Sequence, residues 1–244
     1  MGYNRGIDKE RGTTIMQHIQ IAVDGPSGAG KSTISKAVAA RLGIVYVDTG
    51  ALYRTVGYYA RSQGILLPDV SPIADRLNDI YVEVRYTDGV QNVFLNGENL
   101  GDRIRENEIS LYASAVAALP PVRAFLLDTQ RRIARECSVI MDGRDIGTVI
   151  LPDAQVKIFL AASNEARARR RVAELKEKGM PVEYETVLAD MNRRDEEDRT
   201  RAISPAVAAP DAVLLDNSDL TFEESVEAIL KIVREKTNGK GLSL

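Results

Sequence analysis

The 244-residue chain is 44% hydrophobic and 27% charged, an ordinary globular balance, and it is long enough for one large α/β domain with an inserted lobe. Its formal net charge of −3 argues against a long surface that binds nucleic acid. No apolar run approaches the ~20 residues of a membrane span. Cys137 is the one cysteine, so no internal disulfide can form, which suits the cytoplasm. We expect a cytoplasmic monomer that binds neither nucleic acid nor membrane.

Both chain ends are expected to lie outside the folded domain. Residues 1–15 are polar, rich in glycine and arginine, and lack the apolar core of a signal peptide. We expect residues 1–16 to be a disordered extension, residues 17–236 to form a single domain, and residues 237–244 to be a tail.

The first elements alternate between strand and helix. Residues 18–24 form an apolar run typical of a buried strand, and a glycine-rich turn follows. Ile34, Val38 and Leu42 then recur on one face of a helix, and Gly43 stands where a C-cap is expected. A second strand is expected at 44–47, followed by a helix at 51–62 that Gly64 ends.

The second half of the chain continues the same rhythm. Apolar, strand-like runs lie at 138–141, 156–160 and 212–215, and helical stretches separate them. Thr221 and Glu224 have the spacing of a capping box before the last helix. Short apolar strands that alternate with helices are typical of a parallel sheet covered on both faces. The helices are expected at about 121–136, 164–178, 183–199 and 221–236.

One region departs from this rhythm. Residues 80–86 alternate between apolar and polar side chains, and so do residues 90–95. Asp88-Gly89 and Asn96-Gly97 follow these two runs, and both dipeptides are strong hairpin turns. We therefore expect a small antiparallel meander inserted into the parallel domain.

A glycine-rich segment follows the first predicted strand and opens the first predicted helix. It fits G-x-x-x-x-G-K-[ST] at every position, in the context that validates a phosphate-binding loop. Lys31 is placed to reach the β- and γ-phosphates of a nucleotide, and Ser32 is placed to face Mg²⁺. No Asn-Lys-x-Asp guanine reader is present, which weighs against a GTPase. The residues expected to hold ATP in this loop are Gly25, Pro26, Ser27, Gly28, Ala29, Gly30, Lys31, Ser32 and Thr33.

A second charged motif, Asp142-Gly-Arg-Asp145, directly follows the strand predicted at 138–141. In an open α/β sheet, ligands bind beyond the carboxyl ends of the strands, where the phosphate loop also lies. Asp142 is placed to hold Mg²⁺ through water, Arg144 to clamp a phosphate, and Asp145 to accept a hydrogen bond from an amine. The alternative interpretation is a polar turn with a local ion pair.

A third motif follows the second predicted strand, from Asp48 to Arg54. Arg54 lies one helical turn in, on the side that faces the same strand ends. The alternative interpretation is that Thr49, at a helix start, is simply an N-cap and that Arg54 is a surface arginine.

Two predicted helices near the C-terminal third are rich in arginine. Arg residues of such a hairpin can stabilise the charge that spreads over a transferring phosphoryl group, and the hairpin can exclude water. The alternative is a solvated pair of helices with surface salt bridges. The arginines are Arg167, Arg169, Arg170 and Arg171 in the first helix, and Arg193, Arg194, Arg199 and Arg201 in and after the second.

With these motifs in place, the chain resembles the bacterial cytidylate kinases, in their long form with an insert in the monophosphate-binding lobe. The resemblance covers about 17–236, and the motifs that begin at Asp48 and Asp142 are more specific than the phosphate loop. It implies a P-loop nucleoside-monophosphate kinase with a central parallel sheet, helices on both faces, a small antiparallel insert and an Arg-rich helical lid. The implied division is a core at 17–64, 119–163 and 202–236, a monophosphate-binding lobe with the insert at about 65–118, and a lid at about 164–201.

The resemblance also implies roles for individual residues. Thr49, where the family often has serine, would hold the phosphate of the monophosphate with Arg54 and Arg144. Cytosine would be read by Ser114, Arg123 and Asp145, and the ribose hydroxyls would be bound by Asp198. Arg194 and Arg201 would reach the transferring phosphoryl group from the lid, and Arg170 would pack on the adenine of ATP. The implied catalytic residues are Lys31, Arg144, Arg194 and Arg201.

The implied reaction is phosphoryl transfer from ATP, with Mg²⁺, to CMP and dCMP, giving ADP and CDP from ATP and CMP, in pyrimidine nucleotide metabolism. In-line transfer without a covalent intermediate is expected, because the motifs supply positioning and charge but no histidine or cysteine nucleophile. The chemistry of cytosine agrees, since a carboxylate can accept from its N4 amine and a guanidinium can donate to N3 and O2. Uracil reverses this polarity at positions 3 and 4, so UMP is expected to be a poor substrate.

Two other functions stay open at this point. One is another small P-loop kinase, of the shikimate or dTMP type, which would use acceptor residues other than the Asp142–Asp145 set. The other is a nucleotide-binding switch without enzymatic activity, which would bind partners according to its nucleotide and would transfer nothing to CMP.

Overall fold

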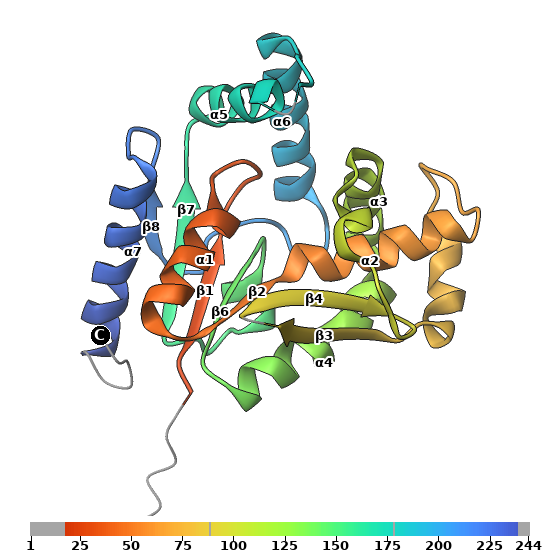
Figure 1. Ribbon diagram of the computed structural model, residues 1–244, viewed down its shortest axis with the longest axis horizontal. Coiled ribbons are helices and arrows are strands. Elements are labelled where there is room, and N and C mark those ends of the chain that lie inside the picture. The colour runs from red at the N-terminus through yellow and green to blue at the C-terminus, as the bar shows by residue number, and fades with distance from the viewer. Residues whose placement is uncertain (1–17, 88, 178, 239–244) are drawn as a thin grey trace, which may run out of the picture.

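Five parallel strands form the central sheet in the order β2-β6-β1-β7-β8, as the alternation of strands and helices predicts (Figure 1). The computed structural model describes residues 18–87, 89–177 and 179–238, so the expected extension over 1–16 and residues 239–244 of the expected tail lie outside the described residues. Because β1 and β6 are neighbours, the motifs that follow them meet at one edge of the sheet. The strands are β1 (Gln20–Asp24), β2 (Val45–Asp48), β6 (Val139–Gly143), β7 (Val156–Ala161) and β8 (Val213–Asp216).

Helices cover both faces of this sheet, and successive residues of each strand point to opposite faces. Ile21 and Val23 of β1 join the core on one side, with residues of α1 and α7. Ala22 joins the core on the other side, with residues of α4 and the π-helical turn η3. The covering elements are α1 (Lys31–Leu42), α4 (Pro120–Glu136), η3 (Ile146–Ile150) and α7 (Phe222–Thr237).

The predicted helix ends are confirmed. Gly43 ends α1 in the left-handed conformation, with φ of 63°. Thr221 and Glu224 form a complete capping box on α7, in which each side chain accepts from the backbone amide of the other residue.

The inserted lobe contains the predicted meander as a second, antiparallel sheet in the order β3-β4-β5. Asn96 and Gly97 both have positive φ, 50° and 85°, as a tight hairpin turn requires. Asp88 of the other predicted turn lies outside the described residues. The strands are β3 (Val82–Thr87), β4 (Val90–Leu95) and β5 (Glu98–Asn99).

Helices pack behind this sheet and complete the core of the lobe. One of them, α3, is absent from the sequence-based prediction. It lies so close to α2 that a Cβ on Gly57 would stand 2.9 Å from Cβ of Tyr112. The buried face of α2 therefore belongs to the lobe core, and the predicted division at residues 64 and 118 stays a prediction. The elements are α2 (Thr49–Ser62), α3 (Asn107–Ala117) and the 3₁₀ segments η1 (Ser71–Asp79) and η2 (Gly101–Arg105).

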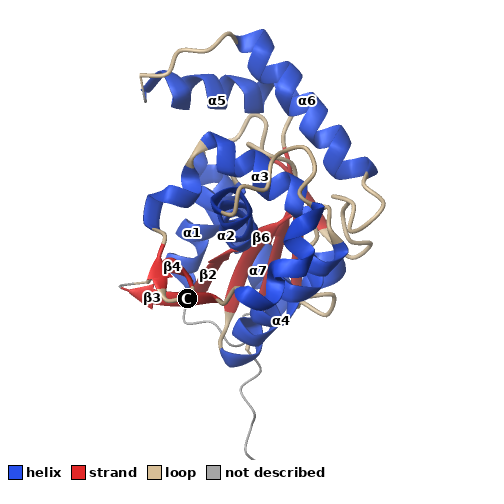
Figure 2. Ribbon diagram, turned by 90° about the vertical axis from the view of Figure 1, so that its right-hand side faces the viewer, coloured by secondary structure: helices blue, strands red, loops and turns tan. Residues whose placement is uncertain are grey.

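The two Arg-rich helices are α5 (Asn164–Glu177) and α6 (Tyr184–Thr200), close to their predicted bounds. They form a hairpin that arches over the edge of the sheet where the phosphate loop lies (Figures 1 and 2). Its core is small: among the described residues, Ala168, Val187 and Met191 form the buried cluster between the helices. We call this hairpin the lid.

In the described part of the chain, no single helix is long and apolar enough to cross a bilayer. One bent pair, Glu108–Ala117 with Pro120–Glu136, passes the same test by length and composition, with an angle of 97° between its helices. Both helices contribute residues such as Ile109 and Leu126 to the buried core of the lobe.

Candidate active site

The loop between β1 and α1 is shaped for a close approach of its backbone to a ligand. Gly25, Gly28 and Gly30 have φ of 147°, 75° and 86°, in the region that favours glycine. A Cβ on Gly25 would lie 2.2 Å from the carbonyl oxygen of Leu160, so the position requires glycine. Among the described residues, no side chain caps α1 and none in its first turn is acidic, so its amides are left to bind an anion.

Lys31 lies buried in this loop. Its Nζ donates a hydrogen bond to the carbonyl oxygen of Pro26 at 2.7 Å. Burial lowers the pKa of Lys31 to about 7, and the charge of Arg144 is the second cause. The carboxylates of Asp142 and Asp24 raise this pKa, but by less. A bound phosphate would favour the charged ammonium, because it brings negative charge to the same place.

The Asp142 carboxylate is held by two hydroxyls. Ser32 Oγ donates to its Oδ2 at 2.7 Å, and Tyr46 Oη donates to its Oδ1 at 2.8 Å. Burial raises the pKa of Asp142, and the neighbouring Asp48 carboxylate raises it further. Tyr46 reaches Asp142 because β2 pairs with β6 in a register that sets Tyr46 opposite Ile140 and Asp48 opposite Asp142.

Ser32 and Asp142 together fit a magnesium ion. Among the described residues, no three His, Cys, Asp or Glu side chains gather as a metal cage. Mg²⁺ in phosphoryl-transfer sites does not need one, because it binds through one or two protein oxygens, water and the phosphates of the substrate. The hydroxyl and carboxylate of this pair are hard oxygen ligands of that kind.

Asp24 ties the end of β1 to the turn after the Asp142–Asp145 motif. Its carboxylate accepts hydrogen bonds from the backbone amides of Ile146, at 2.7 Å, and Gly147, at 2.8 Å. Burial raises the pKa of Asp24 to about 6, although these two hydrogen bonds lower it. The contact fixes the start of the loop after β1 relative to the turn after β6.

The start of α2 corrects one of the sequence-based alternatives. Asp48, and not Thr49, is the N-cap, because its carboxylate accepts from the amide of Ala51 at 2.9 Å. The alternative interpretation of Thr49 as an N-cap is therefore wrong. The Thr49 hydroxyl is buried and donates to the Asp142 carbonyl oxygen at 2.7 Å, while Arg54 forms an ion pair with Asp48 at 2.6 Å.

Arg123 and Asp145 form a buried ion pair, the most enclosed one in the described part of the chain. Arg123 also donates to the carbonyl oxygen of Ala117 at 3.2 Å, and its guanidinium lies 5.6 Å from the centre of the Tyr53 ring. A cavity of about 190 Å³ opens beside Arg123 and Tyr53. The structure thus brings a planar donor and a carboxylate acceptor together next to an aromatic side chain.

Two predicted ligands stand apart from these groups. Ser114 is exposed on α3 and forms no hydrogen bond with Arg123 or Asp145. Arg194 is half-buried on α6, and within the described residues it has neither an ion pair nor a hydrogen bond. Both side chains are therefore available to a ligand, and their predicted roles stay predictions.

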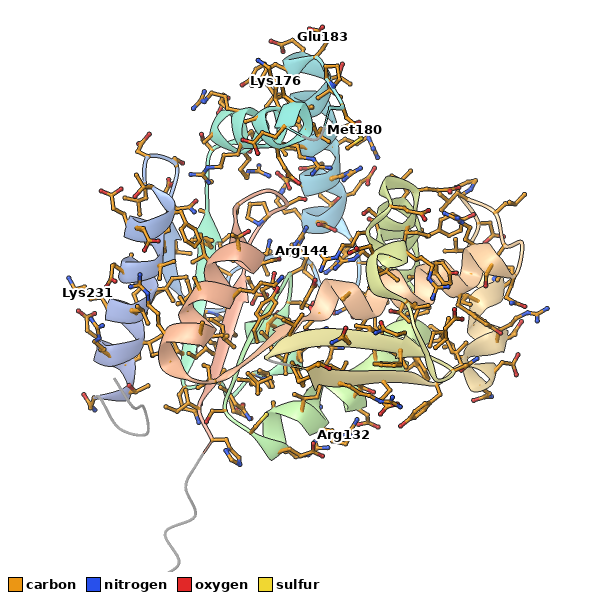
Figure 3. All side chains as sticks on the ribbon, viewed as in Figure 1. Arg132, Arg144, Lys176, Met180, Glu183 and Lys231 are labelled. Atoms are coloured by element: carbon orange, nitrogen blue, oxygen red, sulfur yellow. The ribbon has the colours of Figure 1, made fainter. Side chains whose placement is uncertain are left out.

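The base of the lid meets the Asp142–Asp145 motif through charged side chains. Arg144 Nε donates to Asp198 Oδ2 at 2.8 Å, and Arg201 lies 3.6 Å from the same carboxylate. Burial lowers the pKa of Arg201. Figure 3 shows Arg144 in the centre of the molecule, between the core and the lower end of α6.

Arg170 of α5 is connected to the phosphate loop through Asn217. It donates to the side chain and carbonyl oxygen of Asn217, at 3.3 and 2.6 Å, and Asn217 in turn donates to the Ala29 carbonyl oxygen at 3.0 Å. A cavity of about 140 Å³ lies here, lined by Gly30, Thr33, Arg170, Leu220 and Phe222 among others. The cavity lies beside the phosphate loop, and the predicted contact of Arg170 with an adenine stays a prediction.

The comparison with known proteins decides between the families considered. The sequence model of the family described as Cytidylate kinase matches residues 21–235. The chain belongs to the cytidylate kinase family. Related proteins named cytidylate kinase include one from Fervidobacterium nodosum, 48% identical with 90% of this chain and 98% of the relative covered. Those from Caldicellulosiruptor bescii and Thermosipho melanesiensis are 45% and 48% identical to this chain. Each match covers 89% of this chain, and the matches cover 96% and 97% of the two relatives.

The chain is also similar to some solved structures at low sequence identity. A shikimate kinase from Bacteroides thetaiotaomicron is 14% identical, with a TM-score of 0.45 over 88% of this chain and 98% of its own. A likeness at that level says nothing about the substrate. The match to the cytidylate kinase family, by contrast, includes every residue of the site described above.

Several residues of the site escaped the sequence-based prediction. Tyr46, Asp24 and Asn217 contact the predicted motifs through the packing of strands that are far apart in the sequence. For Asn217 a signal existed, because it directly follows β8 and therefore lies at the same edge of the sheet as the other motifs.

Proposed function

We propose that this chain transfers the γ-phosphoryl group of ATP to CMP, and to dCMP, with UMP a poor substrate. The observation that carries the proposal is the match to cytidylate kinases over residues 21–235, which contain the phosphate loop, the Asp142–Asp145 motif and the lid. The proposed products are ADP and CDP when CMP is the acceptor.

The donor nucleotide binds at the phosphate loop. Backbone amides of the loop and of the first turn of α1 face its phosphates, and Lys31 exchanges its bond with Pro26 for the β- and γ-phosphates. Arg170 packs on the adenine beside Asn217. Ser32 and, through water, Asp142 would hold Mg²⁺, which would supply positive charge to the phosphates.

The acceptor nucleotide binds on the other side of Arg144. Thr49, Arg54 and Arg144 hold its phosphate, which requires Arg54 and Arg144 to give up their carboxylate partners. Asp145 accepts from the N4 amine of cytosine, Arg123 donates to N3 and O2, and Ser114 accepts from the amine. The buried ion pair of Arg123 and Asp145 holds acceptor and donor in place before the base arrives. Asp198 binds the ribose hydroxyls.

The reaction is an in-line displacement at phosphorus. An oxygen of the CMP phosphate forms a bond to the γ-phosphorus as the bond from that phosphorus to the bridging oxygen of ADP breaks, and ADP leaves with the electron pair. Charge spreads over the three equatorial oxygens, where Lys31, Arg144, Arg194 and Arg201 stabilise it. The lid excludes water, which would otherwise accept the phosphoryl group.

A coupled assay of ADP release tests the proposal, with CMP, dCMP, UMP, AMP and shikimate as acceptors. We expect CMP and dCMP to be the best substrates. Faster release with AMP or shikimate, or none with any acceptor, would refute the assignment. With chirally labelled γ-phosphate we expect inversion at phosphorus, whereas net retention would indicate a covalent intermediate.

A further inference from the structure

Arg167 is the most buried charged residue in the described part of the chain, at 1% exposure, and the roles assigned above leave it out. Its guanidinium donates hydrogen bonds to four groups. Nη1 donates to the carbonyl oxygen of Ser27 in the phosphate loop at 2.7 Å, and Nε donates to that of Ala162 at 3.1 Å. Nη2 donates to Asn164 Oδ1 and to the Asp195 carboxylate. One side chain thus joins the loop, the start of α5 and the middle of α6.

The bond to Ser27 fixes the direction of a neighbouring amide. The peptide bond between Ser27 and Gly28 is trans, because Leu67-Pro68 is the one cis bond of the described residues. In a trans peptide the carbonyl and the next N–H point in opposite directions. With the Ser27 carbonyl turned toward Arg167, the Gly28 N–H points away from it, as a phosphate loop requires of its amides.

Packing on the same side of the loop reinforces this arrangement. A Cβ on Gly28 would lie 3.0 Å from Cε of Met191 and 3.5 Å from Cβ of Arg167. The stem of Arg167 and the thioether of Met191 therefore cover one side of the loop. Because both side chains come from the lid helices, the lower part of the lid rests directly on the loop.

We propose that Arg167 is a positioning residue that holds the phosphate loop in its anion-binding shape and links that shape to the lid. Asn164 and Asp195 orient the guanidinium, and Asp195 supplies the charge that a buried arginine needs. A displacement of α6 would pull on Arg167 through Asp195 and turn the Ser27–Gly28 peptide. The inference rests on the proposed function only in taking residues 25–32 as the loop that binds the donor phosphates.

Binding of each nucleotide alone, measured by calorimetry, tests the inference. We expect Arg167→Met to raise the Kd for ADP about tenfold or more and to leave the Kd for CMP within about twofold. The ¹H–¹⁵N signal of the Gly28 amide should shift less on ADP addition than in the parent chain. Arg41→Met is the matched control, since Arg41 lies exposed at the far end of α1 in ion pairs with Glu223 and Glu227, and neither Kd should change.

Two further variants keep the test decisive if Arg167→Met does not fold. Arg167→Lys keeps a charge but loses the fork of donors, and Asp195→Asn removes the charge that orients it, so both should weaken ADP several-fold more than CMP. Unchanged ADP affinity in a folded Arg167 variant, or an equal loss for both nucleotides, would overturn the inference while the proposed function stands. If the parent chain binds ADP but does not phosphorylate CMP, the proposed function fails instead. A parent chain that does not bind ADP would refute both.

Discussion

Arg144 Nε lies 2.8 Å from Asp198 Oδ2, so the loop after β6 and the lid helix α6 are joined by an ion pair. The proposed function gives these side chains separate tasks, one at the acceptor phosphate and one at the ribose. In this structure they neutralise each other, and Asp48 does the same for Arg54. Nucleotide binding therefore exchanges ion-pair partners instead of filling a site of unpaired charges. The cost of separating each pair is modest, since these side chains are partly exposed to water.

The lid should open locally without ligand, because it has few buried apolar side chains of its own. We expect the amides of α5, and those of α6 that precede Met191, to exchange hydrogen much faster than those of β1 and β6. Asp198→Asn should speed exchange at the base of α6 further, since it removes the negative charge that pairs with Arg144. Exchange by mass spectrometry checks this, and a lid as protected as the central strands would contradict it.

Lys31→Ala should lower kcat at least about a hundredfold, because it removes the positive charge at the transferring phosphoryl group. The fold should survive, since the side chain makes one hydrogen bond, to the carbonyl oxygen of Pro26. The ADP-release assay and a thermal melt measure the two effects. Lys231→Ala, at an exposed position of α7, is the control and should match the parent chain. A folded Lys31→Ala protein with near-native turnover would exclude the phosphate-loop assignment.

Asp145→Asn should change base selection more than overall activity. The amide keeps the shape of the carboxylate, but it can rotate and donate to O4 of uracil, while the N4 amine of cytosine loses its ionised acceptor. Hydrogen bonds to charged groups are worth roughly 1.5–3 kcal/mol, so the CMP/UMP ratio of kcat/KM should fall about ten- to a hundredfold.

The Arg123→Ala variant provides the comparison for this measurement. It should weaken both pyrimidines, because both carry O2. If Asp145→Asn lowered CMP and UMP equally, Asp145 would serve only to support the phosphate clamp, and base selection would lie elsewhere.

The pKa of Asp24 predicts a pH dependence of stability. The folded protein holds this proton up to about pH 6, whereas the unfolded chain releases it near 3.8. Between these values the folded state binds more protons, so the contribution of Asp24 to the free energy of unfolding falls as pH rises. The full change is on the order of 3 kcal/mol. Urea denaturation from pH 4 to 7 measures it, with Asp24→Asn as the variant that lacks the titration. A constant difference between the two proteins would show that Asp24 has an ordinary pKa when folded.

A feature of this structure can be predicted from the sequence when the residues that form it lie close together in the chain. The phosphate loop and the Asp142–Asp145 motif follow apolar strands directly, and the topology of parallel sheets then places both at one edge. α3 was missed although Ile109, Tyr112 and Val116 recur at helical spacing and are buried. Its signal was present but lay in a region dominated by the pattern of the meander.

Other features depend on contacts that no local pattern contains. Arg167 meets Ser27, 140 residues away in the sequence, and Tyr46 meets Asp142 only because of the register between β2 and β6. Asp48 and Thr49 illustrate the same limit at short range. Either could cap a helix, but the Asp48 carboxylate accepts from the Ala51 amide, whereas the Thr49 hydroxyl is buried and donates to the Asp142 carbonyl oxygen.

Gln91 of β4 links the meander of the lobe to Asp48, at the start of α2. Its Oε1 accepts from the Asp48 amide at 2.7 Å, and its Nε2 donates to the Asp48 carbonyl oxygen at 3.2 Å. Side chains of a strand alternate between its faces, so a slip of β4 by one residue would turn Gln91 away from Asp48. Asp48 would then lose the clamp on its backbone, next to its contact with Arg54. A slip by two residues would keep the face but bring Gly89 or Val93 to the place of Gln91, and neither has a side chain that can make these hydrogen bonds. The contact therefore requires the register of β4 seen here, and an insertion or deletion that shifts β4 should release the backbone of Asp48.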